Sequence, residues 1–130
     1  MPLPTPPDQP GTNADCRRIS QMLGHMGDKW TIMTITMLVD QRRRFNELRR
    51  LIGGISQQML TRTLRALEAD GIVSRTVHPT VPPQVEYGLT PLGQSLAIPL
   101  LGLTAWVLDN MQTIEQQRAA YQDKTLALQD

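Results

Sequence analysis

The order of elements that the sequence predicts is that of a winged helix-turn-helix, a mainly α-helical domain with a small β-hairpin. Three observations indicate this fold. A short helix and a glycine-containing turn precede a helix with one polar face, a hairpin with a proline-rich tip follows, and a long apolar helix closes the chain. With 130 residues, of which 40% are hydrophobic, the chain can form one such domain around one core.

The ends of the chain differ from its centre. Residues 1–14 contain five prolines, one glycine and little that is apolar, so we expect a disordered arm. Residues 15–114 make up the predicted domain, and residues 115–130 form the end of the last helix and a tail. We find no secretory signal and no run that approaches the roughly 18 apolar residues of a membrane span. We therefore expect a cytoplasmic protein without membrane contact, and its single cysteine, Cys16, agrees with a reducing compartment.

Two helices are predicted before residue 41. Asp15 can cap a first helix that reaches about Met26, and Asp28 can cap a second that ends near Asp40. The second helix is apolar on nearly every face, so it should lie in the middle of the domain. The first helix has one apolar face at helical spacing, which consists of Ile19, Met22, Leu23 and Met26.

A helix-turn-helix unit is predicted next. Arg42–Arg44 should be a turn or short strand, and a short third helix should run from Phe45 to Ile52. Gly53-Gly54 breaks the chain, Ser56 suits the N-cap of a fourth helix, and Gly71 suits the position that follows its end. The inward-facing residues of the third helix are expected to be Phe45, Leu48, Leu51 and Ile52, and those of the fourth Leu60, Thr63, Leu64 and Leu67.

The pattern changes from helical to extended after Gly71. Residues 72–78 are rich in β-branched side chains, residues 79–83 contain three prolines, and residues 84–89 alternate. These features predict a β-hairpin whose second strand has Val85, Tyr87 and Leu89 on one face and Gln84, Glu86 and Gly88 on the other. Thr90-Pro91 then suits the start of a final helix that runs to about Tyr121 and is kinked at Pro99.

Basic charge is concentrated in the centre of the chain, although the net charge of the whole is only +1. Between Arg42 and Arg75 there are eight arginines and three acidic residues, a net charge of +5, whereas residues 106–130 have a net charge of −2. Arginine can pair bidentately with phosphate or with guanine. We therefore expect the central segment to face a double-stranded DNA operator.

The polar face of the fourth helix has the side chains that a helix in the major groove needs, because Gln can pair with adenine and Arg with guanine or phosphate. An ordinary amphipathic helix has the same pattern, but the arginine-rich turn before it and the hairpin after it favour DNA. The hairpin could also be a plain surface hairpin, with Arg44 or Arg75 paired to Glu86 or Asp70. The predicted DNA-binding residues are Arg43, Arg44, Ser56, Gln57, Gln58, Thr61, Arg62, Arg65, Arg75 and His78.

The last helix has an apolar stripe that continues past the length a small core can cover. A helix that packs only on its own domain is the alternative to a dimer interface. A homodimer is favoured because a single winged helix makes too few base contacts for useful specificity. The predicted dimer interface consists of Ile19, Met22, Leu100, Leu103, Trp106 and Val107.

Cys16 lies at the predicted start of the first helix, before Arg17-Arg18. A helix N-terminus and neighbouring cations favour the reactive thiolate, so Cys16 could sense an oxidant or electrophile, although an inert, half-buried residue fits as well. His25 and His78 have no ligand partners at metal-binding spacing. Without a glycine-rich phosphate loop or a recognisable nucleophile–base pair, we expect no metal, no cofactor and no enzymatic activity.

Several strings in one order resemble the HxlR family of bacterial winged-helix regulators, whose architecture is related to that of MarR-type proteins. The resemblance begins with Cys16 and Gly27-Asp28-Lys29-Trp30-Thr31, where an Asp interrupts the usual Gly-Lys-Trp-Thr. It continues through Arg44–Arg50. The strings Ile55–Thr61, Leu64-Arg65 and Leu67–Gly71 look like the recognition helix, and Val81–Thr90 looks like the wing and second strand. Leu92-Gly93, Leu96, Pro99, Leu103 and Trp106 complete the pattern.

This resemblance covers residues 16–114 and implies a homodimer that pairs through its first and last helices, with one recognition helix for each half-site. It also implies a response to electrophiles or oxidants, or to another small-molecule effector, because several members sense such compounds through the N-terminal cysteine. As a lone cysteine, Cys16 could form a disulfide only with a second chain or a small thiol. The sequence thus predicts a sequence-specific transcription regulator, a repressor or dual regulator. The competing interpretations are a winged helix that contacts only proteins and a thiol enzyme centred on Cys16, which lacks an obvious base.

Overall fold

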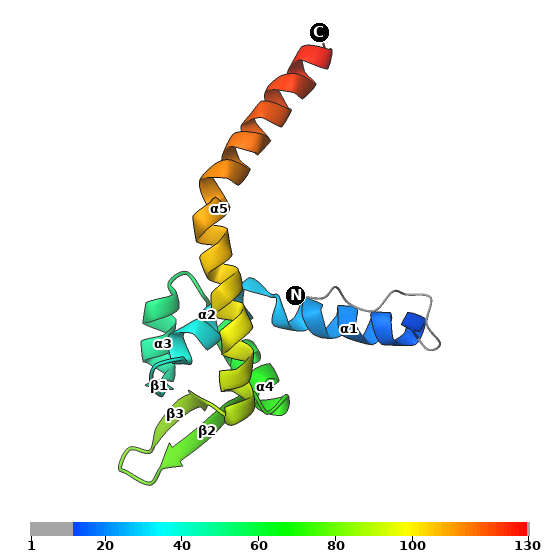
Figure 1. Cartoon of the computed structure of the whole chain (residues 1–130). Helices are drawn as coiled ribbons and strands as arrows, with labels where there is room; N and C mark the ends of the chain where they lie inside the picture. The colour runs from blue at the N-terminus through cyan, green and yellow to red at the C-terminus, as the bar shows by residue number, and fades with distance from the viewer. Residues whose placement is uncertain (1–11, 130) are drawn as a thin grey trace.

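A computed structural model describes residues 12–129, and this part of the chain has the predicted order of a winged helix-turn-helix (Figure 1). Residues 1–11, most of the predicted disordered arm, lie outside the described residues. The elements are α1 (Thr12–Met26), α2 (Lys29–Leu38), β1 (Arg43–Arg44), α3 (Phe45–Ile52), α4 (Gln57–Ala69), β2 (Val73–His78), β3 (Gln84–Leu89) and α5 (Pro91–Gln129).

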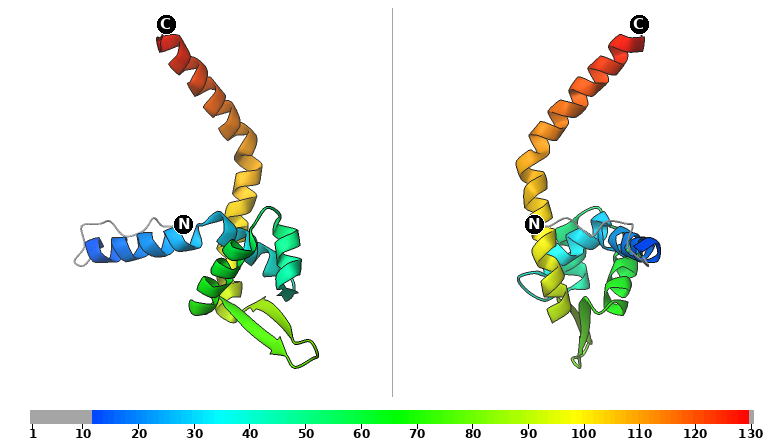
Figure 2. Two further views of the ribbon diagram at one scale, coloured as in Figure 1. Left: turned by 180° about the vertical axis from the view of Figure 1, so that it is seen from behind. Right: turned by 45° about the vertical axis from the view of Figure 1, so that its right-hand side comes forward.

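Helix α1 begins at Thr12, three residues before the predicted start. Asp15 is not its cap but an acidic residue in its first turn, where a negative charge interacts favourably with the helix dipole. The helix points away from the body of the domain and contacts it near its C-terminal end, mainly at α2 (Figures 1 and 2). Its apolar residues therefore remain largely exposed, apart from the half-buried Met26.

Helix α2 lies in the middle of the domain, as its all-round apolar sequence predicts. The Asp28 carboxylate caps it by accepting hydrogen bonds from the backbone N–H groups of Trp30 at 3.1 Å and Thr31 at 3.3 Å. It ends at Leu38, two residues before the expected end, and packs against α3, α4 and α5. Its position makes it the support for both helices of the helix-turn-helix unit.

Helices α3 and α4 have the predicted bounds. The Ser56 hydroxyl accepts a hydrogen bond from the backbone N–H of Met59 at 3.0 Å, and Gly71 has a φ of +74° just after α4. Leu51, expected to face inward, is 40% exposed, because Leu48 and Ile52 already cover the inner face of the short α3. The buried core consists of Ile35, Leu38, Leu48, Ile52, Ile55, Leu60, Leu64, Leu67, Ile72, Val73, Ala97 and Leu100.

The hairpin is the predicted one, although its first strand begins one residue later, at Val73. Strand β3 lies between β2 and the two-residue β1, and both pairings are antiparallel. The six residues of β3 are all half-buried or buried, and the most buried is Gly88, because the Arg42 side chain lies across it.

Helix α5 begins with the predicted cap, in which Thr90 Oγ1 accepts a hydrogen bond from the N–H of Gly93 at 3.1 Å. It contains Pro99, bends as it leaves the domain and extends to Gln129, eight residues past the expected end (Figures 1 and 2). Contrary to the sequence expectation, it is long and apolar enough to cross a membrane by length and composition. The mean hydropathy of its apolar window is 1.4, and 17% of that window is buried.

Candidate nucleic-acid interface

The polar face of α4 forms an open hollow of about 590 Å³ on the surface of the domain. The opposite face of the same helix is fixed by Leu60, Leu64 and Leu67, which are buried in the core. The helix therefore cannot rotate without exposing these leucines, and its outer side chains are held toward solvent as a set. The residues that line the hollow are all predicted DNA-binding residues: Gln57, Gln58, Thr61, Arg62 and Arg65.

Arg62 and Arg65 are exposed and form no ion pair within residues 12–129. Their guanidinium groups consequently need not break an internal contact before they bind a phosphate or a guanine edge. Ser56, by contrast, uses its hydroxyl oxygen to cap α4, so its role in this surface includes holding the start of the helix.

Arg75, a predicted DNA-binding residue of the hairpin, lies beside α4. It is the third residue of β2, and it pairs in register with Tyr87 of β3. Together with Thr61, Arg65 and Glu68 it lines a second hollow of about 290 Å³. Arg75 thus extends the basic surface of α4 toward the base of the wing.

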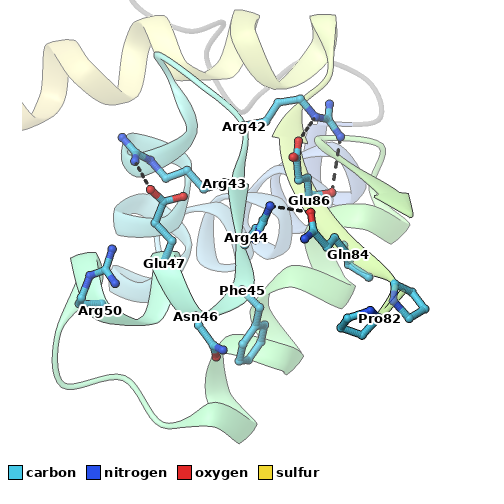
Figure 3. A pocket seen from close by; sticks show the side chains of 12 residues that line it. Arg42, Arg43, Arg44, Phe45, Asn46, Glu47, Arg50, Pro82, Gln84 and Glu86 are labelled. Carbon is cyan, nitrogen blue, oxygen red and sulfur yellow. Dashed lines mark hydrogen bonds and ion pairs between the residues drawn. The ribbon is translucent and has the colours of Figure 1, made fainter. Parts of the chain in front are cut away.

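Two more of the predicted residues, Arg44 and His78, contact strand β3 of the wing. Arg44 is exposed and donates a hydrogen bond from Nη2 to the side-chain oxygen of Gln84 (Figure 3). His78 is half-buried, and its Nε2 lies 3.4 Å from Oε1 of Glu86. Arg44 lies on β1 and His78 on β2, and each already has a partner on β3.

Arg43 does not belong to this surface. Its side chain is 13% exposed, its Nε donates to the backbone oxygen of Met37 at 2.6 Å, and its guanidinium lies 3.2 Å from Glu47 and 3.4 Å from Asp40. These contacts join the end of α2 to the start of α3. The geometry therefore assigns Arg43 to the interior of the domain, not to a phosphate contact.

Sequence reasoning left out two exposed residues of α3. Asn46 and Arg50 line a hollow of about 690 Å³ between α3 and the proline-rich tip, with Pro82 and Pro83 on its other side (Figure 3). Arg50 was counted in the basic segment but not assigned to a site. The helical spacing of α3 indicates both residues, because burial of Leu48 and Ile52 turns the side chains of Asn46 and Arg50 outward.

The residues predicted for dimerisation fall into two groups. Leu100 is 9% exposed and belongs to the core, so its prediction as an interface residue is corrected. The others are free in the single chain, with exposed fractions from 39% to 58%: Ile19, Met22, Leu103, Trp106 and Val107. Cys16 is exposed on α1 as its fifth residue, one turn further from the helix start than expected.

A short helix, a glycine turn, a helix with a polar outer face and an antiparallel wing together define a winged helix-turn-helix DNA-binding domain. The model of the HxlR-like helix-turn-helix family matches residues 25–115. The chain belongs to this family of transcriptional regulators.

Known proteins agree with this assignment. YtfH of Escherichia coli K12, described as an HTH-type transcriptional regulator, is 39% identical over 103 residues, which cover 77% of this chain and 82% of YtfH. The structure of YtfH from Salmonella typhimurium gives a TM-score of 0.72 at 39% identity and covers 78% of this chain and 90% of its own. The redox regulator HypR in its reduced form gives a TM-score of 0.71 at 41% identity, with coverages of 76% and 98%.

Proposed function

We propose that the chain is a sequence-specific DNA-binding transcription regulator that acts as a homodimer. The observation that carries this proposal is one hollow on α4 that gathers two glutamines, a threonine and two arginines, and these arginines form no ion pair within residues 12–129. These side chains can make bidentate contacts with adenine and guanine in the major groove. The buried leucines on the other face hold the helix in one orientation, which base recognition requires.

The rest of the surface suits contacts with the DNA backbone. Arg75 continues the basic face from α4, His78 places a hydrogen-bonding group on the wing, and Arg44 of β1 places a cationic group beside it. Such contacts fix the register of a protein on the duplex and carry little sequence information. We assign α4 to the major groove and the wing to the flanking phosphates or minor groove.

The homodimer rests on the apolar surface that one chain leaves uncovered. Leu103, Trp106 and Val107 on α5 and Ile19 and Met22 on α1 are exposed, although each is a residue type that is usually buried. A second copy would cover these residues and would place two α4 helices against two half-sites. We infer that this pairing, and not a lipid bilayer, explains the apolar character of α5, and that the protein works in the cytoplasm.

A second candidate property is regulation through Cys16, because its thiol is exposed on a helix that also carries the predicted interface. HypR, to which the chain is similar, is described as a redox regulator in oxidised and reduced forms. Oxidants or electrophiles would modify the thiol and alter how two chains pair. We expect treatment with a thiol-reactive compound to change the DNA affinity of the wild type but not of Cys16→Ser. An equal response in both proteins would remove Cys16 as the switch.

Selection of fragments from the host's genomic DNA tests the DNA-binding proposal. The selected duplex should bind far more tightly than a scrambled duplex of the same length. Its log–log plot of affinity against salt should have a slope steeper than about −4, since each neutralised phosphate contributes about −0.9. Equal affinity for both duplexes would contradict sequence-specific binding, and the absence of duplex affinity would favour a winged helix that contacts only proteins.

A further inference from the structure

Arg42, the residue before β1, reaches across both strands of the wing. Its Nη1 donates to the Ser74 hydroxyl at 3.2 Å, and its Nη2 donates to the Thr76 hydroxyl, so two of its contacts are on β2. On β3 its Nη2 donates to the backbone oxygen of Glu86 at 3.5 Å, and its Nε lies 3.6 Å from the Glu86 carboxylate (Figure 3). One guanidinium therefore joins the segment between α2 and α3 to both strands of the hairpin.

Gly88 provides the space for this arrangement. A Cβ atom at Gly88 would lie 2.6 Å from Nη1 of Arg42, 2.9 Å from its Cγ and 3.0 Å from its Cζ. Cβ contacts under 3.0 Å are essentially never observed, so a side chain at position 88 would force the Arg42 side chain to shift from its place across β3. Any larger residue at position 88 would displace the arginine.

Apart from the hydrogen bond between Arg44 and Gln84, the outer half of the wing has little other attachment. Val77 is 50% exposed and Val81 is fully exposed, so neither contributes to a core. Strand pairing between the wing and the segment before α3 is limited to the two residues of β1, which pair with Glu86 and Tyr87. A two-stranded hairpin is only marginally stable by itself. The angle of the wing relative to α3 and α4 must therefore depend on the side chains that bridge the wing and the helix-turn-helix unit.

We infer that Arg42 is a positioning residue for DNA recognition, which holds the wing at a fixed angle to the recognition helix α4. This inference rests on the proposed function. Arg42 acts through the wing and not by contact with a phosphate, because its donors are directed to Ser74, Thr76 and Glu86 and the Glu86 carboxylate balances its charge.

Three variants test this role. Arg42→Ala removes the bridge and one charge, Gly88→Ala displaces the bridge without a change of charge, and Thr76→Val removes one acceptor in an isosteric side chain. We expect the first two to accelerate amide hydrogen exchange in β2 and β3 of the free protein and to weaken binding to the selected duplex by roughly fivefold to thirtyfold. Thr76→Val should have a smaller effect of the same kind. Lys124→Ala, which removes a positive charge at the far end of α5, should change neither measurement.

The double variant gives the sharpest outcome. With Arg42 already removed, a methyl group at position 88 meets no arginine, so Arg42→Ala/Gly88→Ala should bind DNA no more weakly than Arg42→Ala alone. Unchanged exchange in β2 and β3 in both single variants would overturn the inference. Weaker binding by Arg42→Ala but not by Gly88→Ala would overturn it as well. That result would mean that the charge of Arg42, which Gly88→Ala leaves in place, contacts a phosphate directly and that its position across the wing does not matter. If the wild type binds no duplex, the proposed function fails, and the exchange measurement alone decides whether Arg42 holds the wing.

Discussion

Nε2 of His25 lies 3.0 Å from Oδ2 of Asp70, which joins the end of α1 to the residue at the C-terminal end of α4. This pair connects the helix that carries Cys16 to the helix with the polar hollow. Since α1 otherwise contacts the domain mainly at α2, the pair is one of few contacts that relate its position to that of α4.

The His25–Asp70 pair should orient α1 more than it stabilises the fold. Both side chains are about 40% exposed, at 44% and 39%, so solvent screens their interaction. We expect His25→Ala to lower the free energy of unfolding by less than about 1 kcal/mol while amide exchange in α1 becomes faster. Urea denaturation and hydrogen exchange measure the two effects. A loss of stability well above this value would show that the pair is part of the core structure.

Replacement of Arg43 by alanine should lower the stability of the fold, whereas replacement of Arg62 should weaken DNA binding, although both residues were predicted to bind DNA. Arg43→Ala leaves the Met37 carbonyl and the Glu47 carboxylate without their partner, and we expect it to cost about 1–3 kcal/mol of stability. Arg62→Ala removes an exposed side chain and should leave the unfolding midpoint nearly unchanged while it weakens DNA binding. Denaturant titrations of both variants test the distinction, which fails if Arg43→Ala is as stable as the wild type.

Two glycines of α5 provide a matched pair of substitutions. A Cβ at Gly93 would lie 2.2 Å from the backbone oxygen of Ile72, whereas one at Gly102 would meet nothing within 4 Å. We expect Gly93→Ala to destabilise the domain by about 1–3 kcal/mol through forced backbone movement. Gly102→Ala should raise stability by about 0.5–1 kcal/mol, because alanine is the better helix former. Thermal unfolding of the two variants should shift in opposite directions, and a shift in the same direction would contradict this packing of α5.

The proposed dimer predicts that Trp106 is needed for assembly. Trp106→Glu places a charge in the middle of the exposed apolar stretch of α5 and should shift the protein to monomers in sedimentation experiments. Leu92→Glu is the control, since Leu92 is equally exposed but lies in the first turn of α5, outside the predicted interface. A dimer that persists in Trp106→Glu would place the interface elsewhere.

Local signals predicted most of the fold. Ser56, Gly71 and Thr90-Pro91 are the residues that begin or end helices for reasons within a few positions of the chain, and the elements they delimit have the predicted bounds at those ends. The polar face of α4 could be predicted for the same reason. Burial of Leu60, Leu64 and Leu67 follows from helical spacing and leaves the glutamines and arginines outside.

The errors concern contacts between distant parts of the chain. Arg43 was predicted to bind DNA because it is a positive charge in the basic segment. The acceptors at Met37 and Glu47 that hold it are brought near it only by the tertiary fold. Leu100 belongs to the apolar stripe of α5, and the stripe itself does not tell where the core ends. The fit of Arg42 over Gly88 joins positions 46 residues apart, and no local pattern indicates it.

The most direct test of the central claim is a titration of the selected duplex with Arg65→Ala. Arg65 lies in the hollow of α4 and beside Arg75, so its loss should weaken binding by roughly 1–3 kcal/mol and relax the base preference at one position of each half-site. Lys124→Ala, with the same loss of charge at the far end of α5, should bind as the wild type does. Unchanged affinity and base preference in Arg65→Ala would contradict the assignment of α4 as the helix that reads DNA.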